Sequence, residues 1–323
     1  MENQNEKFDL GYDKEEFLKI LDQIEDMRVY AEDDAGRVGL YRECPFGFGC
    51  GRLPQKSTDG TQEIDLDKLT ELIDTHMEQG FNYFEASGID ADAISETALR
   101  KTLTDIYLRD IIEVGSDGTL RKATNTEEVK AILQGSLDRL GVEYLDYYAV
   151  SIGTADLRHL RESGIFDTLS AWKPDGLVRY LGLIADGSAE DLESVLSAAG
   201  DLFDYVRMEL NYLDMDTDPE MRSRLSVAER YQKPVCACGT LKGGELIRLP
   251  EEAKALLKAY DGTASIASWG LRFAAGQTGV FRVICNMETW DQVIADCETF
   301  IELTAFNQEE SEMIGKVTEI LKK

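Results

Sequence analysis

The sequence predicts an α/β fold, a (β/α)8 barrel of the TIM type with an acidic helical extension at its N-terminus. Three observations lead to this prediction. The chain has 323 residues, a length that suits one α/β barrel with extensions. Its hydrophobic fraction of 43% is sufficient for a large core. From about residue 45, short apolar runs alternate with amphipathic segments of helix length, which is typical of repeated βα units.

The predicted extension comprises residues 1–36, and the predicted barrel comprises residues 37–323. The extension is strongly acidic, and its apolar residues between Phe17 and Met27 recur at helical spacing, so we expect one amphipathic helix there. Packing of this helix on its own domain is the favoured interpretation. Contact with a partner is the alternative.

Eight apolar runs are expected to form the strands of the barrel, and functional side chains are expected where the strand ends meet the following loops. Between the third and fourth strands, Thr126-Glu127-Glu128-Val129 opens a helix whose apolar face ends near Gly141. The predicted strands are Phe46–Cys50, Phe81–Glu85, Ile111–Ser116, Leu145–Ser151, Val178–Ile184, Tyr205–Leu210, Pro234–Cys238 and Phe281–Cys285.

The composition excludes several classes of partner. Lys and Arg total 34 against 62 Asp and Glu, and the formal net charge of −28 would repel phosphate backbones and anionic lipid headgroups. We therefore expect neither a nucleic acid nor a membrane as partner. The same charge disfavours a cofactor with several phosphates unless local cations compensate. No leader-like start and no apolar stretch of roughly 18 residues occurs, so we expect a cytoplasmic protein.

The cysteines and histidines are interpreted as structural. The six cysteines lack CxxC spacing and are expected to be reduced thiols. Cys50, Cys238 and Cys285 end neighbouring strands of a closed barrel, so a thiol cluster is geometrically possible, although small buried side chains are the favoured interpretation. His76 and His159 lie on predicted helices, where a packing or surface role is expected.

Several segments resemble the aldo-keto reductase family, in the order and at the spacing of that family. The resemblance covers roughly residues 38–320 and is closest to a branch that often carries a ferredoxin-like tail. No clustered cysteines follow Cys297, so the tail is expected to be absent. The segments are Gly47–Pro54, Gly80–Phe84, Ser95–Leu99, Leu137–Tyr148, Gly176–Gly182, Leu210–Asp214, Leu241–Gly244 and Trp269–Phe273.

The resemblance implies carbonyl reduction by hydride transfer from NAD(P)H. In that chemistry a Tyr donates the proton, a Lys and an Asp tune it, and a His orients the carbonyl. The sequence departs from the pattern at all four positions. Glu85 stands at the Asp position and Asp90 near the Tyr position, while Asp117 or its neighbour Ser116 replaces the Lys and Ser151 replaces the His.

The positions that the resemblance assigns to the cofactor are substituted as well. Ile184-Ala185 replace the Ser-Asn pair that holds the nicotinamide, and Arg207 replaces a Gln on the sixth strand. Lys242 is a plausible phosphate contact, with a solvated loop lysine as the equal alternative, and Asn286 begins the segment that matches a cofactor loop. We therefore expect no cofactor and no metal, with NADP possible from the resemblance.

These substitutions favour a non-classical or catalytically inactive family member that acts through binding. Its partner, a small molecule or a protein, is not identified by the sequence. One alternative is an NAD(P)H-dependent oxidoreductase of small carbonyl compounds with an unconventional proton donor such as Glu85. The other is an acid/base enzyme, or a cation site, at the same barrel mouth, although a solvated acidic rim is the favoured interpretation. The acid/base enzyme or cation site would use Glu85, Asp90, Asp117 and Glu209 around Arg207 and Ser151.

Overall fold

The computed structural model describes residues 45–58, 61–89, 91–153 and 157–322, with the side chains of residues 58, 61, 62, 91 and 159 left out. The chain divides into two units, Met1–Glu43 and Cys44–Lys323. The predicted N-terminal extension, with its helical pattern from Phe17 to Met27, lies outside the described residues. Its boundary at residue 36 stays a prediction.

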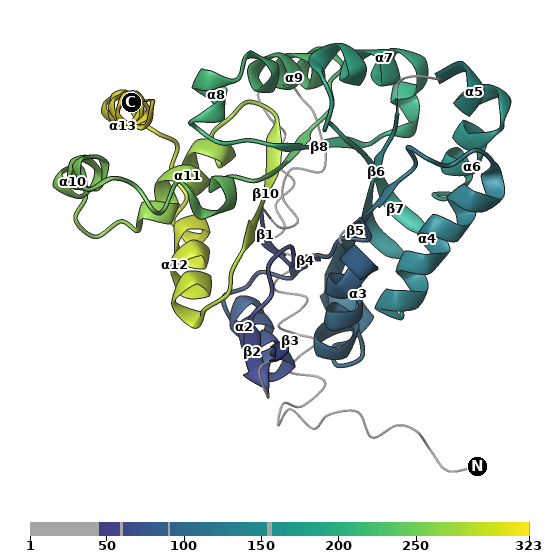
Figure 1. Ribbon diagram of the computed structural model, residues 1–323, viewed down its shortest axis with the longest axis horizontal. Helices are drawn as coiled ribbons and strands as arrows, with labels where there is room; N and C mark the ends of the chain where they lie inside the picture. Colours follow the sequence, from purple (N-terminus) through teal and green to yellow (C-terminus); the bar gives the residue numbers. More distant parts are fainter. Residues whose placement is uncertain (1–44, 59–60, 90, 154–156, 323) are drawn as a thin grey trace. The chain divides into compact units, whose positions relative to one another are not determined.

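Eight parallel strands close into a barrel in the order β1-β10-β9-β8-β7-β6-β5-β4 (Figure 1). Because every neighbouring pair is parallel, all eight strands end at the same mouth of the barrel. This confirms the predicted (β/α)8 barrel, and each strand overlaps one of the predicted runs. The strands are β1 (Phe46–Gly49), β4 (Tyr83–Glu85), β5 (Glu113–Thr119), β6 (Leu145–Ser151), β7 (Val178–Ile184), β8 (Tyr205–Glu209), β9 (Val235–Cys238) and β10 (Val280–Asn286).

Helices surround the barrel (Figure 1). The predicted helix near Thr126 is α4, which Asn125 caps by accepting a hydrogen bond from Glu128 N at 3.0 Å and which ends at Gly141 with φ +67°. No helix in the described part of the chain is long and apolar enough to cross a bilayer. The helices are α2 (Leu66–Glu78), α3 (Ile94–Leu99), α4 (Thr126–Leu140), α5 (Leu157–Glu162), α6 (Ile165–Ala171), α7 (Ala189–Ala199), α8 (Asp214–Thr217), α9 (Pro219–Arg230), α10 (Glu251–Tyr260), α11 (Ile266–Ala275), α12 (Trp290–Ile301) and α13 (Gln308–Leu321).

An antiparallel hairpin between β1 and α2 is not predicted by the sequence pattern. It consists of β2 (Gln55–Thr58) and β3 (Thr61–Ile64). The residues of β2 are all polar, so they lack the apolar alternation that indicates a strand with one buried face. Since the hairpin follows the C-terminal end of β1, it belongs to the loops of the barrel mouth.

A second apolar cluster stabilises the C-terminal helices. α10 packs on α13, and both lie beside α11 at the periphery of the barrel (Figure 1). The buried centre of the cluster includes Leu246, Leu257, Trp269 and Val317. These helices therefore have a core of their own, and α11 also contacts β10 of the barrel.

Aromatic and charged side chains fill the barrel interior. The ring of Tyr147 lies 5.3 Å from that of Tyr83 and 5.7 Å from that of Tyr205, measured between centroids. The guanidinium carbon of Arg282 lies 3.8 Å from the Tyr83 centroid and 4.2 Å from the Tyr147 centroid. Arg282 Nη2 also lies 2.9 Å from Glu113 Oε2. These cation–π and ionic contacts offset the cost of burying the Arg282 charge.

His76 of α2 is completely buried between its helix and the barrel, in agreement with the predicted packing role. Cys297 Sγ lies 3.5 Å from its Nδ1. Burial lowers the pKa of His76 to about 3, so the ring is neutral in the folded protein. The side chain of His159 is outside the described structure. The rings within 6 Å of the His76 ring are those of Phe46, Phe48, Phe81 and Phe84.

The burial of His76 predicts that stability falls as the pH drops below about 6.5, the ordinary histidine pKa. The unfolded chain binds a proton there that the folded chain excludes until the pH nears the folded pKa of about 3. The expected slope from this residue is about 1.4 kcal/mol per pH unit just below 6.5. Urea unfolding at pH 7.5 and 5.5 should show that His76→Phe removes this slope. Parallel pH dependences of the two proteins would contradict the prediction.

Candidate functional site

A cavity of about 610 Å³, here called the mouth cavity, opens at the C-terminal ends of the strands. Ligand pockets have roughly this size, about 300–1,000 Å³, and barrels of this type carry their sites at this end. The cavity combines charged and apolar walls. Its lining includes Glu85, Asp117, Asp186, Arg207, Glu209 and Arg224, together with Ile89, Ile184, Met208 and Ile284.

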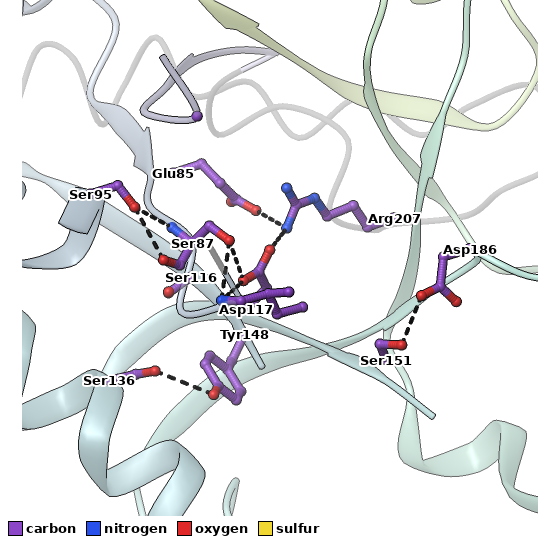
Figure 2. Close-up of polar contacts among 12 residues, drawn as sticks. Glu85, Ser87, Ser95, Ser116, Asp117, Ser136, Tyr148, Ser151, Asp186 and Arg207 are labelled. Atoms are coloured by element: carbon purple, nitrogen blue, oxygen red, sulfur yellow. Dashed lines mark hydrogen bonds and ion pairs between the residues drawn. The ribbon is translucent and has the colours of Figure 1, made fainter. Parts of the chain in front are cut away.

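The floor of the mouth cavity is an ion cluster of Glu85, Asp117 and Arg207, here called the Arg207 cluster (Figure 2). Arg207 comes from β8 and crosses the barrel to the ends of β4 and β5, from which it is separated by β6 and β7. Its Nη1 lies 2.6 Å from Asp117 Oδ2 and 3.0 Å from Glu85 Oε1. One guanidinium thus compensates two carboxylates.

Glu85 connects the Arg207 cluster to the barrel interior. Its Oε2 accepts a hydrogen bond from the hydroxyl of Tyr83, and only 3% of the residue is exposed. Burial raises the pKa of Glu85, with Arg207 acting in the opposite direction. Burial and the neighbouring Glu85 also hold the pKa of Tyr83 well above its usual range. The Tyr83 phenol is therefore a weak acid, and it lies below the cavity floor.

Besides pairing with Arg207, Asp117 holds the loop after β4 in place (Figure 2). Its Oδ1 accepts hydrogen bonds from Ser87 Oγ at 2.7 Å and from Ile89 N at 3.1 Å. The backbone N–H of Ser87 donates in turn to Ser95 Oγ at 2.9 Å. A buried carboxylate requires such donors in addition to its ion pair. The position of the loop and the geometry of the ion cluster therefore depend on one another.

Ser151 lies in a separate cluster, whereas one alternative from the sequence set the carboxylates around Arg207 and Ser151 together. Its Oγ donates to Asp186 Oδ2 at 2.8 Å and accepts from Arg121 Nε at 2.8 Å. Arg121 and Asp186 are also ion-paired. Figure 2 shows Ser151 and Asp186 apart from the Arg207 cluster. The reason is that Arg121, in the loop after β5, supplies a second cation that the sequence pattern did not indicate.

Three predicted site residues remain, and the structure treats each of them differently. Asp90 lies outside the described residues. Asn286 lines the mouth cavity, and its Oδ1 accepts a hydrogen bond from Gly51 N at 3.0 Å. Lys242 does not line the mouth cavity, and its Nζ is paired with Asp214. Lys242 as a phosphate contact therefore stays a prediction, and in the structure a neighbouring carboxylate compensates its charge.

Two arginines that sequence reasoning missed line a smaller cavity of about 180 Å³ beside the first. Arg52 Nη2 and Arg248 Nη2 both donate to the carbonyl oxygen of Gly243, at 2.9 Å and 3.2 Å. Gly243 and Gly244 adopt positive φ angles of 62° and 86° in this loop. Arg52 and Arg248 are far apart in the sequence and lie in irregular segments, so no periodicity could have paired them.

The thiols do not form a metal site in the described structure. The described residues contain no group of three or more His, Cys, Asp or Glu side chains placed to hold a metal ion. Cys50 and Cys285 are buried, whereas Cys238 is half-buried at the mouth cavity. Burial raises the pKa of each of these thiols, so they are protonated and unreactive at neutral pH.

Comparison with known proteins assigns the chain to a family. The profile described as the Aldo/keto reductase family matches residues 45–319. The chain belongs to the aldo/keto reductase family. An aldo-keto reductase from Mycolicibacterium smegmatis is 24% identical over 266 residues, which cover 81% of this chain and 84% of that protein. This finding confirms the resemblance given by the sequence motifs.

Solved structures of family members share the fold. The holo form of aldo-keto reductase AKR11C1 from Bacillus halodurans matches with a TM-score of 0.67 at 20% identity, covering 84% of this chain and 91% of that one. An aldo-keto reductase from Klebsiella pneumoniae, solved in complex with NADPH, matches with a TM-score of 0.68 at 15% identity, covering 85% of this chain and 90% of that one. At such identities the likeness concerns the fold alone.

Gly115 provides a test of the Tyr83–Glu85 contact. A Cβ at this position of β5 would collide with the Tyr83 hydroxyl and with Glu85 Oε2. We predict that Gly115→Ala lowers the free energy of unfolding by about 1–3 kcal/mol, measured by urea denaturation at pH 7. The control is Gly315→Ala in α13, where nothing lies within 4 Å of the added methyl. It should be neutral or stabilising by up to about 1 kcal/mol. Unchanged stability of Gly115→Ala would speak against the contact.

Removal of the cation from the Arg207 cluster tests its energetics. We predict that Arg207→Met lowers the free energy of unfolding by about 3–5 kcal/mol at pH 7, because it leaves two buried carboxylates without a cation. Unpaired buried carboxyls have folded pKa values above the unfolded ones, so the deficit relative to wild type should shrink as the pH falls toward about 4.

The matched control for Arg207→Met is Arg230→Met. Arg230 is an exposed residue of α9 that pairs with Glu193 at the surface, 3.2 Å away. This variant should change the free energy of unfolding by at most about 1 kcal/mol. A deficit of Arg207→Met that is constant from pH 7 to 4 would show that the cluster does not hold two ionised carboxylates.

Proposed function

We propose that this protein does not reduce carbonyls by the tyrosine-based route of its family and that it acts by binding a small molecule in the mouth cavity. The observation that carries the proposal is the Arg207 cluster. The family resemblance places an Asp, a Lys and a proton-donating Tyr at this point of the barrel. Here the cation comes from the opposite strand β8 and is shared by two carboxylates, Glu85 and Asp117.

The scarcity of proton donors in the mouth cavity supports the proposal. Among the described residues that line the mouth cavity there is no Tyr, Lys or His. The phenol of Tyr83 is 1% exposed and hydrogen-bonded to Glu85, and its raised pKa makes it a poor acid. Ser151, at the position that the resemblance assigns to the orienting His, is bonded to Arg121 and Asp186.

The residues at the nicotinamide position do not fit a nicotinamide held for hydride transfer. A carboxamide requires both donors and acceptors. Ile184 and Ala185 present apolar side chains to the cavity at the end of β7, and Arg207 is engaged by Glu85 and Asp117. The net charge of −28 further disfavours a dinucleotide with several phosphates, and it disfavours nucleic acid as a partner.

Acid–base chemistry at the same mouth is the second candidate, and one observation favours it. Glu85 is a buried carboxyl on the cavity floor, and burial raises its pKa. A carboxyl with a raised pKa is suited to proton transfer at neutral pH. Such a group could serve an acid/base enzyme, or a reductase with Glu85 as its proton donor. In both cases Glu85→Gln would abolish activity.

Turnover and cofactor binding separate these functions. We predict that the pure protein oxidises NADPH and NADH no faster than the protein-free solution when it is offered benzaldehyde or methylglyoxal. Titration of either dinucleotide against tryptophan fluorescence should give no saturable change in the micromolar range. Steady turnover that is lost in Glu85→Gln and kept in Glu298→Gln, an exposed site on α12, would contradict the proposal and favour the second candidate.

A further inference from the structure

Arg224 of α9 is a cation of the mouth cavity whose charge is incompletely compensated. Its side chain is 14% exposed, and in the described structure its ion-pair partner is Asp218, whose Oδ2 lies 3.5 Å from Arg224 Nη2. Its Nη1 donates to the carbonyl oxygen of Gly187 at 3.0 Å, whereas its Nε is buried without a partner in the described part of the chain. Buried guanidinium groups normally have both a close ion pair and bonded N–H groups. Arg224 therefore lacks an acceptor, preferably an anionic one.

The other charged groups of the lining are compensated, with one exception. Arg207 already has two carboxylate oxygens within 3.0 Å of its Nη1, so a third carboxylate there would be repelled. Asp186 is paired with Arg121 and accepts a hydrogen bond from Ser151. The exception is Glu209, which is exposed and forms no hydrogen bond and no ion pair with any residue that the structure describes. The described lining thus offers one cation that needs an anion and one carboxylate that can receive a cation.

Arg224 and Glu209 lie at the ends of two neighbouring strands. Arg224 bonds to Gly187, which follows the end of β7 by three residues. Directly after β7, the backbone N–H of Ala185 donates to the carbonyl oxygen of Arg207 on β8 at 2.9 Å. Glu209 follows Arg207 by two residues, so both side chains project from the same face of β8. The guanidinium of Arg224 and the carboxylate of Glu209 therefore line the mouth cavity at adjacent positions of the barrel.

The apolar part of the lining defines the rest of the ligand. It comprises Ile89, Ile184, Met208 and Ile284. Ile184 ends β7, the strand whose following loop Arg224 contacts. Apolar side chains combined with a few polar groups are typical of sites for small organic molecules, and a volume of about 610 Å³ accommodates a molecule of the size of an amino acid.

From these contacts we propose that the mouth cavity binds an α-amino acid with an apolar side chain, in its zwitterionic form. The carboxylate is directed to Arg224 and supplies the missing acceptor, the ammonium group is directed to Glu209, and the hydrocarbon side chain packs on the isoleucines. The zwitterion has no net charge, so the net charge of −28 does not repel it as it repels a simple anion. This inference rests on the proposed function, since it names the class of small molecule that the cavity binds.

Binding at Arg224 requires only a local exchange of contacts. Asp218 is half-exposed and, as the cap of α9, accepts a hydrogen bond from Glu220 N at 2.9 Å. It therefore keeps a protein partner and water when its long contact with Arg224 is given up. A small rotation of the guanidinium then presents Nε and Nη2 together, and two parallel N–H donors of this kind bind a carboxylate in a bidentate manner.

Three probes with one hydrocarbon group test the inference, namely leucine, 4-methylpentanoate and 3-methylbutylamine. The second lacks the ammonium group, and the third lacks the carboxylate. Isothermal titration calorimetry at pH 7 and low salt should show saturable binding of leucine, about tenfold tighter than that of either analogue, because each analogue loses one charged contact. Glycine, which lacks the hydrocarbon group, should also bind about tenfold more weakly than leucine.

Variants of the two charged residues assign the contacts. Arg224→Gln and Glu209→Gln should each weaken leucine about tenfold. Arg224→Gln should leave the affinity of 3-methylbutylamine unchanged, and Glu209→Gln that of 4-methylpentanoate. The matched controls are Arg230→Gln on α9 and Glu298→Gln on α12. Both replace exposed residues outside the described lining of the mouth cavity and should leave the affinity for leucine unchanged.

A second variant of Arg224 separates binding from folding. Arg224→Gln also removes the bond to Gly187, so urea unfolding verifies that each variant is folded. Arg224→Lys keeps the positive charge but removes the paired Nε and Nη2 donors, and its affinity for leucine should lie between those of wild type and Arg224→Gln. Glu209 is exposed, so Glu209→Gln should keep the wild-type stability and tests the inference even if Arg224→Gln does not fold.

The remaining outcomes decide against the inference. No binding of leucine, equal affinities for leucine and 4-methylpentanoate, or an unchanged leucine affinity in folded Arg224→Gln or Glu209→Gln would overturn it. Binding of one analogue in place of leucine would overturn it while leaving the proposed binding function intact. NADPH-dependent turnover of a carbonyl compound, in contrast, would overturn the proposed function itself.

Discussion

The sharing of one guanidinium by two buried carboxylates is the constraint on which the mouth of this barrel depends. Arg207 spans the barrel from β8, and its charge allows Glu85 and Asp117 to stay buried side by side. Asp117 in turn holds the loop after β4 through Ser87 and Ile89. The shape of the cavity and its electrostatics therefore follow from the same three charges.

The charged floor continues into the barrel interior. Tyr83 donates to Glu85 from below, and Arg282 lies over the ring of Tyr83 and pairs with Glu113. A column of polar contacts thus replaces part of the apolar packing that usually fills such barrels. Each member of the column is compensated by its neighbours, which reconciles the buried charges with a stable fold.

The barrel and most of its strands could be predicted because strand and helix periodicities are local properties of the sequence. The positions of Glu85, Asp117 and Arg207 on the strands came from the strand pattern together with the family resemblance, and the structure brings these three together. The partners of Ser151 and Lys242 could not be predicted, since Arg121 and Asp214 lie in loops and helix ends without periodicity. The hairpin of β2 and β3 could not be predicted either, because β2 is polar throughout and lacks apolar alternation.

The Arg207 cluster also restricts which substitutions this barrel can accept one at a time. A Lys in place of Asp117 would place two cations beside the single carboxylate of Glu85. A Gln in place of Arg207 would leave two buried carboxylates without a cation. Each replacement made alone is expected to lower stability, whatever its effect on activity. The two positions therefore have to change together if the charge balance at the mouth of the barrel is to be kept.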